Sequence, residues 1–328
     1  MLEDKKIKNS FKEIFFFLLP FLIVLLFLIP VPYYIDAGGG VIKLDNKISI
    51  DGEKENGFYG ALYVREAKGN VLTYLLSYVV PSFDRVKIEK VLIDEDKQSY
   101  DYREKLFFTS SLDNATKIAF EKAGKKVKVS SSKFYIIYID KAAKVELKSG
   151  DEIIKIDGKS FTTYDEMLNL LNKNKESVFI TVVRDDKEII TKNYFIDFEG
   201  SKKLGIVISN EIKYTSDPKV EFNFKGKEAG SSGGLMIALS IYDKLMDYDI
   251  TKGKKITGTG SIDLDGNVEA VSGIKYKLMA AKNSKADIVF VPFDNYEEAK
   301  EIYEEKNYTF DLVPVKTFEE AVNYLNNH

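Results

Sequence analysis

GKEAGSSGGLMIALSIYDKL, residues 226–245, is the stretch on which the fold of the C-terminal third depends. Its second half repeats apolar residues at spacings of three and four, which predicts a helix with one buried face. The residues of that face are Leu235, Ala238, Leu239, Tyr242 and Leu245. Its first half, GSSGG, follows two segments with strand patterns, LGIVISNEIKY and VEFNFKG. Flexible linkers separate domains, whereas this run lies between a strand and a buried helix, so we expect a fixed turn that presents Ser231 or Ser232.

The composition restricts the chemistry that such a serine could perform. The chain has 328 residues, of which 45% are hydrophobic and 30% charged, which suits two or three globular domains. The net charge of -3 gives no sign of nucleic-acid binding. The sequence contains no cysteine, and its single histidine is His328. Thiol catalysis and cysteine-bound metals are therefore excluded, and a Ser-His-Asp triad is not expected, so a serine hydrolase here needs another base.

Residues 14–35, IFFFLLPFLIVLLFLIPVPYYI, carry no charge and are long enough for a helix that crosses a bilayer, which takes ~20 residues. Four lysines precede this run, namely Lys5, Lys6, Lys8 and Lys12. Because positive residues favour the cytoplasmic side, we expect a cytoplasmic stub at 1–13, a single transmembrane helix at 14–35 and an extracellular remainder. The predicted localisation is the cell membrane. The alternative is a cleaved signal peptide, which the length of the run and the lack of an A-x-A-like site disfavour.

Residues 37–125 form an N-terminal extracellular region with strand and helix patterns and no evident core of its own. We expect this region to pack with the C-terminal domain, so that the unit between them is an insertion. That unit, residues 126–197, alternates strand patterns with a short helix. It resembles a PDZ domain in the sequence LKSGD at 147–151, in the strand EIIKIDGK and in a helix at 164–171.

The PDZ resemblance implies that an extended peptide binds by adding a strand to a sheet edge. The expected edge consists of Phe134, Tyr135, Ile136 and Ile137. No glycine-rich carboxylate loop precedes these residues, which leaves open whether a free C-terminus binds. A structural spacer with an unused groove is the alternative.

Two motifs in the C-terminal third resemble those of the Lon proteases. In that family GPSAG carries the nucleophilic serine, and GG-x-x-x-K carries its lysine partner. Here the first motif reads GSSGG at 230–234 and the second SGIKYK at 272–277, with TG at 259–260 and DG at 265–266 between them. The resemblance implies that Ser232 is the nucleophile and Lys277 its partner, in a Lon-type proteolytic α/β domain at 198–328.

The residues are compatible with this chemistry on their own. A lysine acts as a base only when neutral, and burial can lower its pKa by roughly 3 to 5 units. Lys277 shares an apolar helical stripe with Ile274, Leu278 and Ala281, whereas Lys275 is expected to face solvent.

Small residues beside Ser232 would let backbone N–H groups reach a substrate oxyanion. The supporting residues expected there are Gly230, Ser231 and Gly233. Thr259 is expected to hold the lysine amine, and Thr257 is the second candidate for that role.

The whole layout resembles the anchored Lon-like proteases of Gram-positive bacteria, the YlbL and SepM group. The implied fold class is α+β: a transmembrane helix, a PDZ-like domain and a Lon-type proteolytic domain. No GxxxxGK[ST] motif for nucleotide phosphates is present. We therefore expect an ATP-independent, membrane-anchored serine endopeptidase that cleaves peptides or unstructured protein segments outside the membrane, without cofactor, metal or nucleic acid. The alternative is a catalytically inactive anchored scaffold that binds peptides through the PDZ-like domain, and the sequence leaves homo-oligomerisation open.

Overall fold

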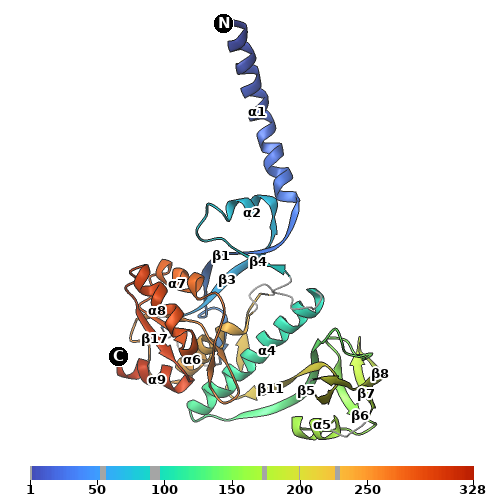
Figure 1. Cartoon of the computed structure of the whole chain (residues 1–328). Helices are drawn as coiled ribbons and strands as arrows, with labels where there is room; N and C mark the ends of the chain where they lie inside the picture. The colour runs from blue at the N-terminus through green and yellow to red at the C-terminus, as the bar shows by residue number, and fades with distance from the viewer. Residues whose placement is uncertain (1, 52–56, 89–96, 172–175, 199, 226–229) are drawn as a thin grey trace. The chain divides into compact units, whose positions relative to one another are not determined.

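The computed structural model describes residues 2–51, 57–88, 97–171, 176–198, 200–225 and 230–328. The chain divides into two compact units, Met1–Gly39 with Val64–Ile93, and Gly40–Tyr63 with Asp94–His328. Two long strands, β1 (Pro30–Lys43) and β3 (Phe58–Asn70), run from one unit into the other (Figure 1). This division differs from the predicted boundaries, because residues 64–93 group with the N-terminal segment.

The first unit contains helix α1 (Leu2–Leu28), the short helix α2 (Val71–Leu76) and strand β4 (Asp84–Lys87). Helix α1 ends before Pro30, because proline donates no hydrogen bond and biases the residue before it away from helical geometry. Strand β1 begins at Pro30 and pairs antiparallel with β4. The prediction of one helix over residues 14–35 is therefore wrong at its C-terminal end. In the described segments, no helix combines the length and the apolarity that crossing a membrane requires.

A six-stranded sheet has the order β17-β16-β13-β3-β1-β4, and its parallel strands β17, β16 and β13 form the centre of the second unit. Its strands β13 (Lys255–Gly258), β16 (Ile288–Pro292) and β17 (Asp311–Val315) pair parallel with their neighbours. Ile256 and Phe290 share a buried cluster with helices α4 (Lys97–Lys122), α6 (Gly234–Leu245) and α9 (Phe318–Asn327). Val289 and Val291 point to the opposite face and pack with α7 (Ile274–Asn283) and α8 (Tyr296–Glu305).

Segments far apart in the sequence build the larger of these two cores. Ile48, Tyr59 and Phe120 are buried in the same cluster as Leu235 and Leu239 of α6. The cluster therefore joins residues that precede the five-stranded sheet at 127–216 to residues that follow it.

Residues 127–216 hold this antiparallel sheet, with the order β11-β5-β6-β7-β8. Its strands are β5 (Val127–Ile139), β6 (Glu152–Ile156), β7 (Ser177–Arg184), β8 (Lys187–Tyr194) and β11 (Ile206–Ser216), and helix α5 (Tyr164–Leu171) packs on it. Strand β11 lies beyond residue 197, where the sequence placed the end of this domain. The sheet therefore takes in part of the segment that was assigned to the C-terminal domain.

The predicted peptide-binding edge is wrong, because Phe134, Tyr135, Ile136 and Ile137 lie in an interior strand. Phe134 and Tyr135 pair with β11 on one side and with β6 on the other. Ile136 donates its N–H to the carbonyl of Asp151 at 3.0 Å. Phe134 and Ile136 are apolar because they fill the sheet core, and a peptide cannot add to a strand whose two sides are already paired.

Three short strand pairs and two 3-10 turns complete the described fold. Strand β2 (Ile48–Ile50) pairs with β12 (Val220–Phe222), β9 (Ile196–Phe198) with β10 (Ser201–Lys203), and β14 (Ser261–Ile262) with β15 (Val268–Glu269). Two 3-10 turns, η1 (Ser231–Gly233) and η2 (Phe293–Asn295), precede α6 and α8.

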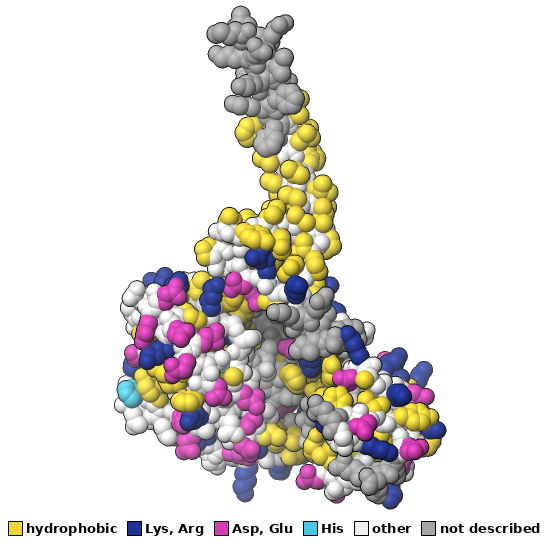
Figure 2. Space-filling view, viewed as in Figure 1, with side chains coloured by type: hydrophobic (Ala, Val, Ile, Leu, Met, Phe, Trp, Pro, Cys, Tyr) yellow, Lys and Arg dark blue, Asp and Glu magenta, His cyan; other side chains and the backbone are white. Residues whose placement is uncertain are grey.

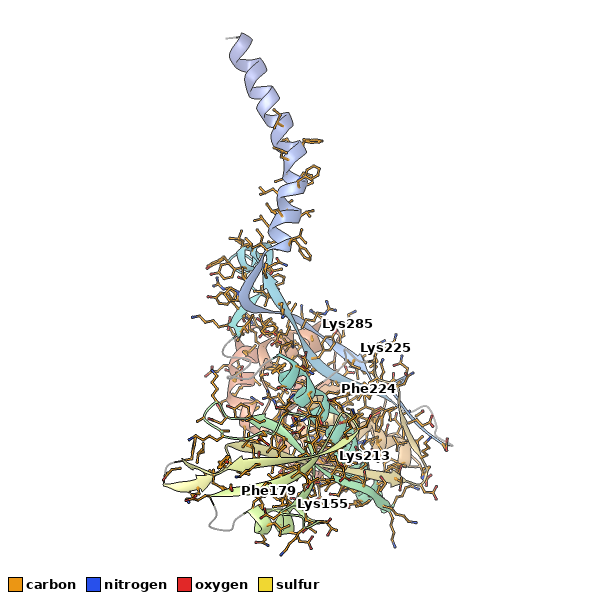
Figure 3. All side chains as sticks on the ribbon, turned by 90° about the vertical axis from the view of Figure 1, so that its right-hand side faces the viewer. Lys155, Phe179, Lys213, Phe224, Lys225 and Lys285 are labelled. Carbon is orange, nitrogen blue, oxygen red and sulfur yellow. The ribbon has the colours of Figure 1, made fainter. Side chains whose placement is uncertain are left out.

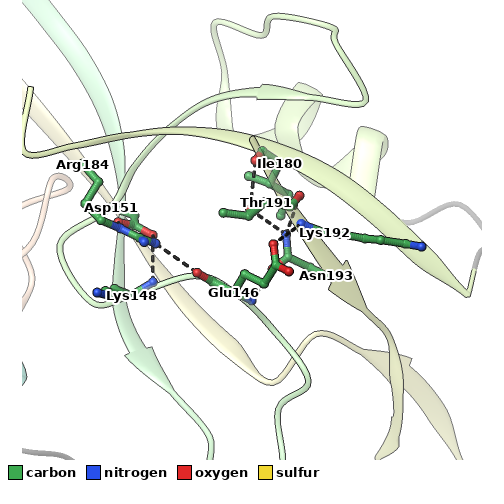
Figure 4. Close-up of polar contacts among 8 residues, drawn as sticks. All are labelled: Glu146, Lys148, Asp151, Ile180, Arg184, Thr191, Lys192 and Asn193. Atoms are coloured by element: carbon green, nitrogen blue, oxygen red, sulfur yellow. Dashed lines mark hydrogen bonds and ion pairs between the residues drawn. The ribbon is translucent and has the colours of Figure 1, made fainter. Parts of the chain in front are cut away.

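An ion pair braces the LKSGD turn of the five-stranded sheet (Figure 4). The Asp151 carboxylate, whose side chain is 1% exposed, accepts from Arg184 Nε and Nη2 at 2.7 Å each and from the Lys148 N–H at 2.7 Å. Arg184 also donates to the carbonyl of Glu146 at 3.0 Å. The motif that suggested a PDZ domain therefore has a structural task, which is to fasten this turn to β7.

Replacing Asp151 by alanine is expected to lower the free energy of unfolding by about 3 kcal/mol, because it strands the partly buried guanidinium of Arg184. Urea denaturation followed by circular dichroism measures the loss. Lys219→Ala breaks the exposed pair with Glu221 and should leave the midpoint where it is. Equal midpoints for wild type and Asp151→Ala would show that the brace does not stabilise the fold.

Candidate active site

The serine turn connects to helix α6 through backbone geometry that requires glycine. Residues 226–229 of the stretch GKEAGSSGGLM lie outside the described residues. Gly230 has φ 144° and ψ 127°, a conformation that side-chain-bearing residues rarely adopt. A Cβ on Gly234 would lie 2.7 Å from Ser111 Oγ and 3.1 Å from the Ile262 nitrogen, so α6 can start here only because the residue has no side chain. The sequence GSSGG is therefore a packed turn.

Hydrogen bonds hold the backbone of this turn against the segment that follows β13. The Ser232 carbonyl accepts from the Gly260 N–H at 2.7 Å and from the Thr259 hydroxyl at 3.0 Å. The Leu235 N–H donates to the Gly260 carbonyl at 3.1 Å. The TG pair of the sequence thus fixes the position of Ser232, and Thr259 supports the serine turn.

The two serines of the turn differ in their side-chain contacts. Ser231 Oγ lies 3.2 Å from Ser261 Oγ, within hydrogen-bond distance, and the Ser231 carbonyl accepts from Ser111 Oγ at 3.3 Å. Among the residues that the structure describes, the Ser232 hydroxyl makes no hydrogen bond. Ser232 is therefore the hydroxyl of this pair that is available to a substrate or a base.

Lys277 is a buried cation in the first turn of α7. Its neighbours Ile274, Leu278 and Ala281 are buried, and Lys277 itself is 3% exposed, whereas Lys275 is exposed. Burial lowers the pKa of Lys277 to about 8, because the ammonium form loses its hydration. A substantial fraction of this amine is therefore neutral near physiological pH, as a base requires.

Ser232 and Lys277 lie at the same end of the parallel sheet, on helices that cover opposite faces. The turn with Ser232 bonds to residues just after the carboxyl end of β13. Helix α7 leads into β16, which runs parallel to β13, so its last turn lies near the amino ends of the strands and its first turn near their carboxyl ends. Ligand sites of open α/β sheets form at the carboxyl ends.

Within the described part of the chain, no hydrogen bond joins Ser232 to Lys277 or Lys277 to Thr259. The dyad therefore stays a prediction, and catalytic hydrogen bonds often tighten only when substrate is bound. The hydroxyl of Thr257 is buried and has no hydrogen-bond partner among the described residues. Alternation along β13 turns Thr257 away from Ile256 and towards the face that α7 covers, which makes it the second candidate partner for the lysine amine.

A cavity of about 430 Å³, which the sequence interpretation missed, lies between α5 and the first residues of β11. Leu168 and Leu171 line it from the helix, and Ile206 and Ile208 line it from the strand. In the described fold, β11 is the terminal strand of its sheet. The signal available in the sequence was LGIVIS at 204–209, a glycine inside an apolar strand pattern that lay beyond the expected domain boundary.

Residues 225–326 match the Lon protease (S16) C-terminal proteolytic domain. Lon protease of Campylobacter jejuni is 28% identical over 178 residues, which cover 53% of this chain and 21% of that protein. Lon protease of Aster yellows witches'-broom phytoplasma is 34% identical over 28% of this chain and 11% of that protein. Lon protease 2 of Bacillus subtilis is 25% identical over 46% of this chain and 28% of that protein. The chain thus spans less than a third of the length of these relatives.

Two solved structures align with part of the chain. They are the PDZ domains of SdrC-like proteins from Listeria innocua, 24% identical, and Listeria monocytogenes, 25% identical, each with a TM-score of 0.22. They cover 23% and 25% of this chain and 92% of each solved chain.

Proposed function

We propose that the protein is an ATP-independent serine endopeptidase in which Ser232 is the nucleophile and Lys277 the general base. The observation that carries this proposal is the buried Lys277, whose lowered pKa has no structural benefit, since an ion pair or an apolar residue would suit the core better. The match of residues 225–326 to the Lon proteolytic domain supports the assignment.

The reaction follows from the properties of these two groups. Neutral Lys277 Nζ accepts the proton of the Ser232 hydroxyl while Oγ bonds to the peptide carbonyl carbon. Backbone N–H groups of the turn at 230–234 would stabilise the oxyanion, an effect worth about 2.7 to 4 kcal/mol per donor. The Lys277 ammonium then gives its proton to the leaving amine, and the C–N bond breaks. Water, deprotonated by the regenerated amine, releases the acyl group and restores the serine.

We infer that the substrate peptide binds at β11, the terminal strand of the five-stranded sheet. An extended peptide can pair with residues 206–208 of β11 while its side chains enter the apolar cavity beside α5. Lys202 and Lys203 border the same cavity and would attract acidic groups of the peptide. This position replaces the edge at Phe134 that the sequence indicated.

Attachment to a membrane through α1 is part of the proposal. The second half of this helix exposes a continuous series of large apolar side chains (Figure 2), among them Phe16, Phe21, Leu25 and Leu28. The lysines before this series favour a cytoplasmic N-terminus, with the second unit outside the cell.

The purified chain is expected to cleave an unfolded protein, such as casein, at the same rate with and without ATP. The reason is that no nucleotide-binding motif is present to drive unfolding of the substrate. A stably folded domain without loose ends should resist. Gel electrophoresis of timed digests measures this, with Ser232→Ala as the blank. Cleavage that rises sharply with ATP would contradict the proposal, and a wild type that binds peptides without cleaving any would favour the inactive scaffold.

A further inference from the structure

An exposed apolar surface on the first unit has no role in the proposed chemistry. It consists of Leu75, Leu76, Tyr78 and Val79, at the end of α2 and in the turn after it, and we call it the apolar tip. These side chains are between 36% and 74% exposed, and none of the residues of α2 is buried. Residues 71–83, VLTYLLSYVVPSF, contain no charge. Exposed apolar clusters of this kind mark sites of interaction.

Backbone N–H groups at and beside the apolar tip are paired within the segment. Asn70 and Thr73 form a capping box, with the Thr73 N–H donating to Asn70 Oδ1 at 2.9 Å. In the turn, the N–H groups of Tyr78, Val79 and Val80 donate to carbonyls of α2 at 3.2, 3.0 and 2.8 Å. Backbone groups that enter an apolar medium must be paired, because no water is present to bind them. These N–H groups meet that condition without a protein partner.

Aromatic and basic side chains adjoin the apolar tip through Tyr78. Tyr33, Tyr74 and Tyr78 form a chain of ring contacts with centroids 5.2 and 5.6 Å apart, and the Arg85 guanidinium lies 3.8 Å from the Tyr78 ring centre. Tyrosine prefers the boundary between hydrocarbon and water, and arginine binds phosphate. Apolar, aromatic and basic side chains therefore lie together here, the combination found where a bilayer meets water.

The register of β1 and β4 separates the charges along the first unit. Lys87 pairs with Tyr33, near the end of α1, whereas Asp84 pairs with Asp36, farther along β1. The Val71 N–H donates to the Ile29 carbonyl at 2.9 Å, which joins the start of α2 to the end of the apolar series on α1. Figure 2 shows hydrophobic side chains continuing from the described part of α1 around its base. The basic residues thus lie on the side of the acidic pair that is nearer to α1.

We propose that the apolar tip is a second lipid-binding element, which inserts into the interfacial layer of a bilayer containing anionic lipid. The side chains of Leu75, Leu76 and Val79 enter the acyl boundary, and Arg85 and Lys87 contact lipid phosphates. Binding at α1 and at the tip together would fix the orientation of the first unit on the membrane, which a single helix leaves free to rotate.

A single tryptophan can report the position of the tip, because the natural sequence contains none. In full-length Val79→Trp, vesicles of phosphatidylcholine with phosphatidylglycerol should shift the emission to shorter wavelength, and brominated lipid should quench it. Phe179→Trp, at an exposed position of β7 in the second unit (Figure 3), is the matched control and should show neither effect. Adding Arg85→Gln and Lys87→Gln to Val79→Trp should weaken tip insertion by on the order of fivefold per charge.

Leu25→Trp separates the tip from α1, because it reports insertion of the helix alone. Quenching of Leu25→Trp without quenching of Val79→Trp would overturn the proposal and leave α1 as the sole attachment. A second outcome would also overturn the proposal. In it, Val79→Trp emits at short wavelength without lipid, the emission depends on protein concentration, and brominated lipid does not quench it. The tip would then bind a second copy of the chain. Unchanged hydrolysis of a soluble peptide shows that the variants are folded.

Discussion

Replacing Ser232 by alanine is expected to lower kcat/KM for peptide hydrolysis by roughly four orders of magnitude or more, because it removes the only atom that forms the acyl bond. The fold should survive, since the Ser232 hydroxyl has no hydrogen bond among the described residues and its carbonyl contacts to Thr259 and Gly260 are unchanged. Initial rates on a fluorogenic peptide measure the loss, and thermal denaturation confirms that the variant is folded.

Ser231→Ala is the matched control, one residue away in the same turn. It removes a contact with Ser261, so a small loss of stability and of rate is expected while most activity remains. Loss of activity in Ser231→Ala alone, or an equal loss in both variants, would show that the nucleophile is not Ser232.

The second large effect is expected at Lys277. Because burial lowers its pKa to about 8, kcat/KM should rise about tenfold per pH unit below that value and level off above it, well before the ordinary lysine pKa of about 10.4. Lys277→Arg should be inactive throughout, since guanidinium remains protonated. Lys277→Met should be inactive as well, because a thioether cannot accept the proton. The rate profile between pH 6 and 10 is the measurement.

Lys275→Gln is the control for the choice of lysine, because Lys275 is exposed on the same helix and should be dispensable. Substantial activity in Lys277→Arg would remove this lysine from the role of base. In that case a carboxylate such as Glu228, which lies outside the described residues, would have to be tested.

Stability provides a readout of Lys277 that does not depend on activity. The pKa of Lys277 is lower in the folded protein than in the unfolded chain, so between about pH 8 and about pH 10.4 the unfolded chain binds more protons. The burial of Lys277 therefore destabilises the folded state fully below about pH 8 and no longer does so above about pH 10.4. Lys277→Met should therefore be more stable than the wild type at pH 7, by about 3 kcal/mol, with a difference that shrinks towards pH 10. An unchanged difference across this range would mean that Lys277 is solvated.

The apolar tip bears on how a membrane surface would orient the first unit. The tip and α1 belong to the same compact unit, whereas Ser232 and Lys277 belong to the other. If both elements bind lipid, the first unit is fixed on the membrane independently of catalysis, and the tip variants should change membrane binding without changing hydrolysis of soluble peptides.

Local patterns in the sequence were sufficient for the parts of the site that depend on one turn or one helix. GSSGG before an apolar stripe predicts the serine turn, and the period of SGIKYKLMAA predicts that Lys277 is turned inward and Lys275 outward. These features follow from helix geometry and from the backbone freedom of glycine, and both depend only on residues that are close together in the sequence.

Pairing between distant segments was decided only by the tertiary structure. The alternation of the apolar run at Phe134 fits an edge strand and an interior strand equally well. The run is interior because β11, which lies beyond residue 197, pairs with it. The sequence likewise could not group Val64–Ile93 with the N-terminal segment, nor show that Thr259 bonds to Ser232. The sequence pattern of a strand is the same whichever strand pairs with it. Side-chain alternation shows only which face of the strand is buried, whereas pairing uses backbone hydrogen bonds that every residue other than proline can make.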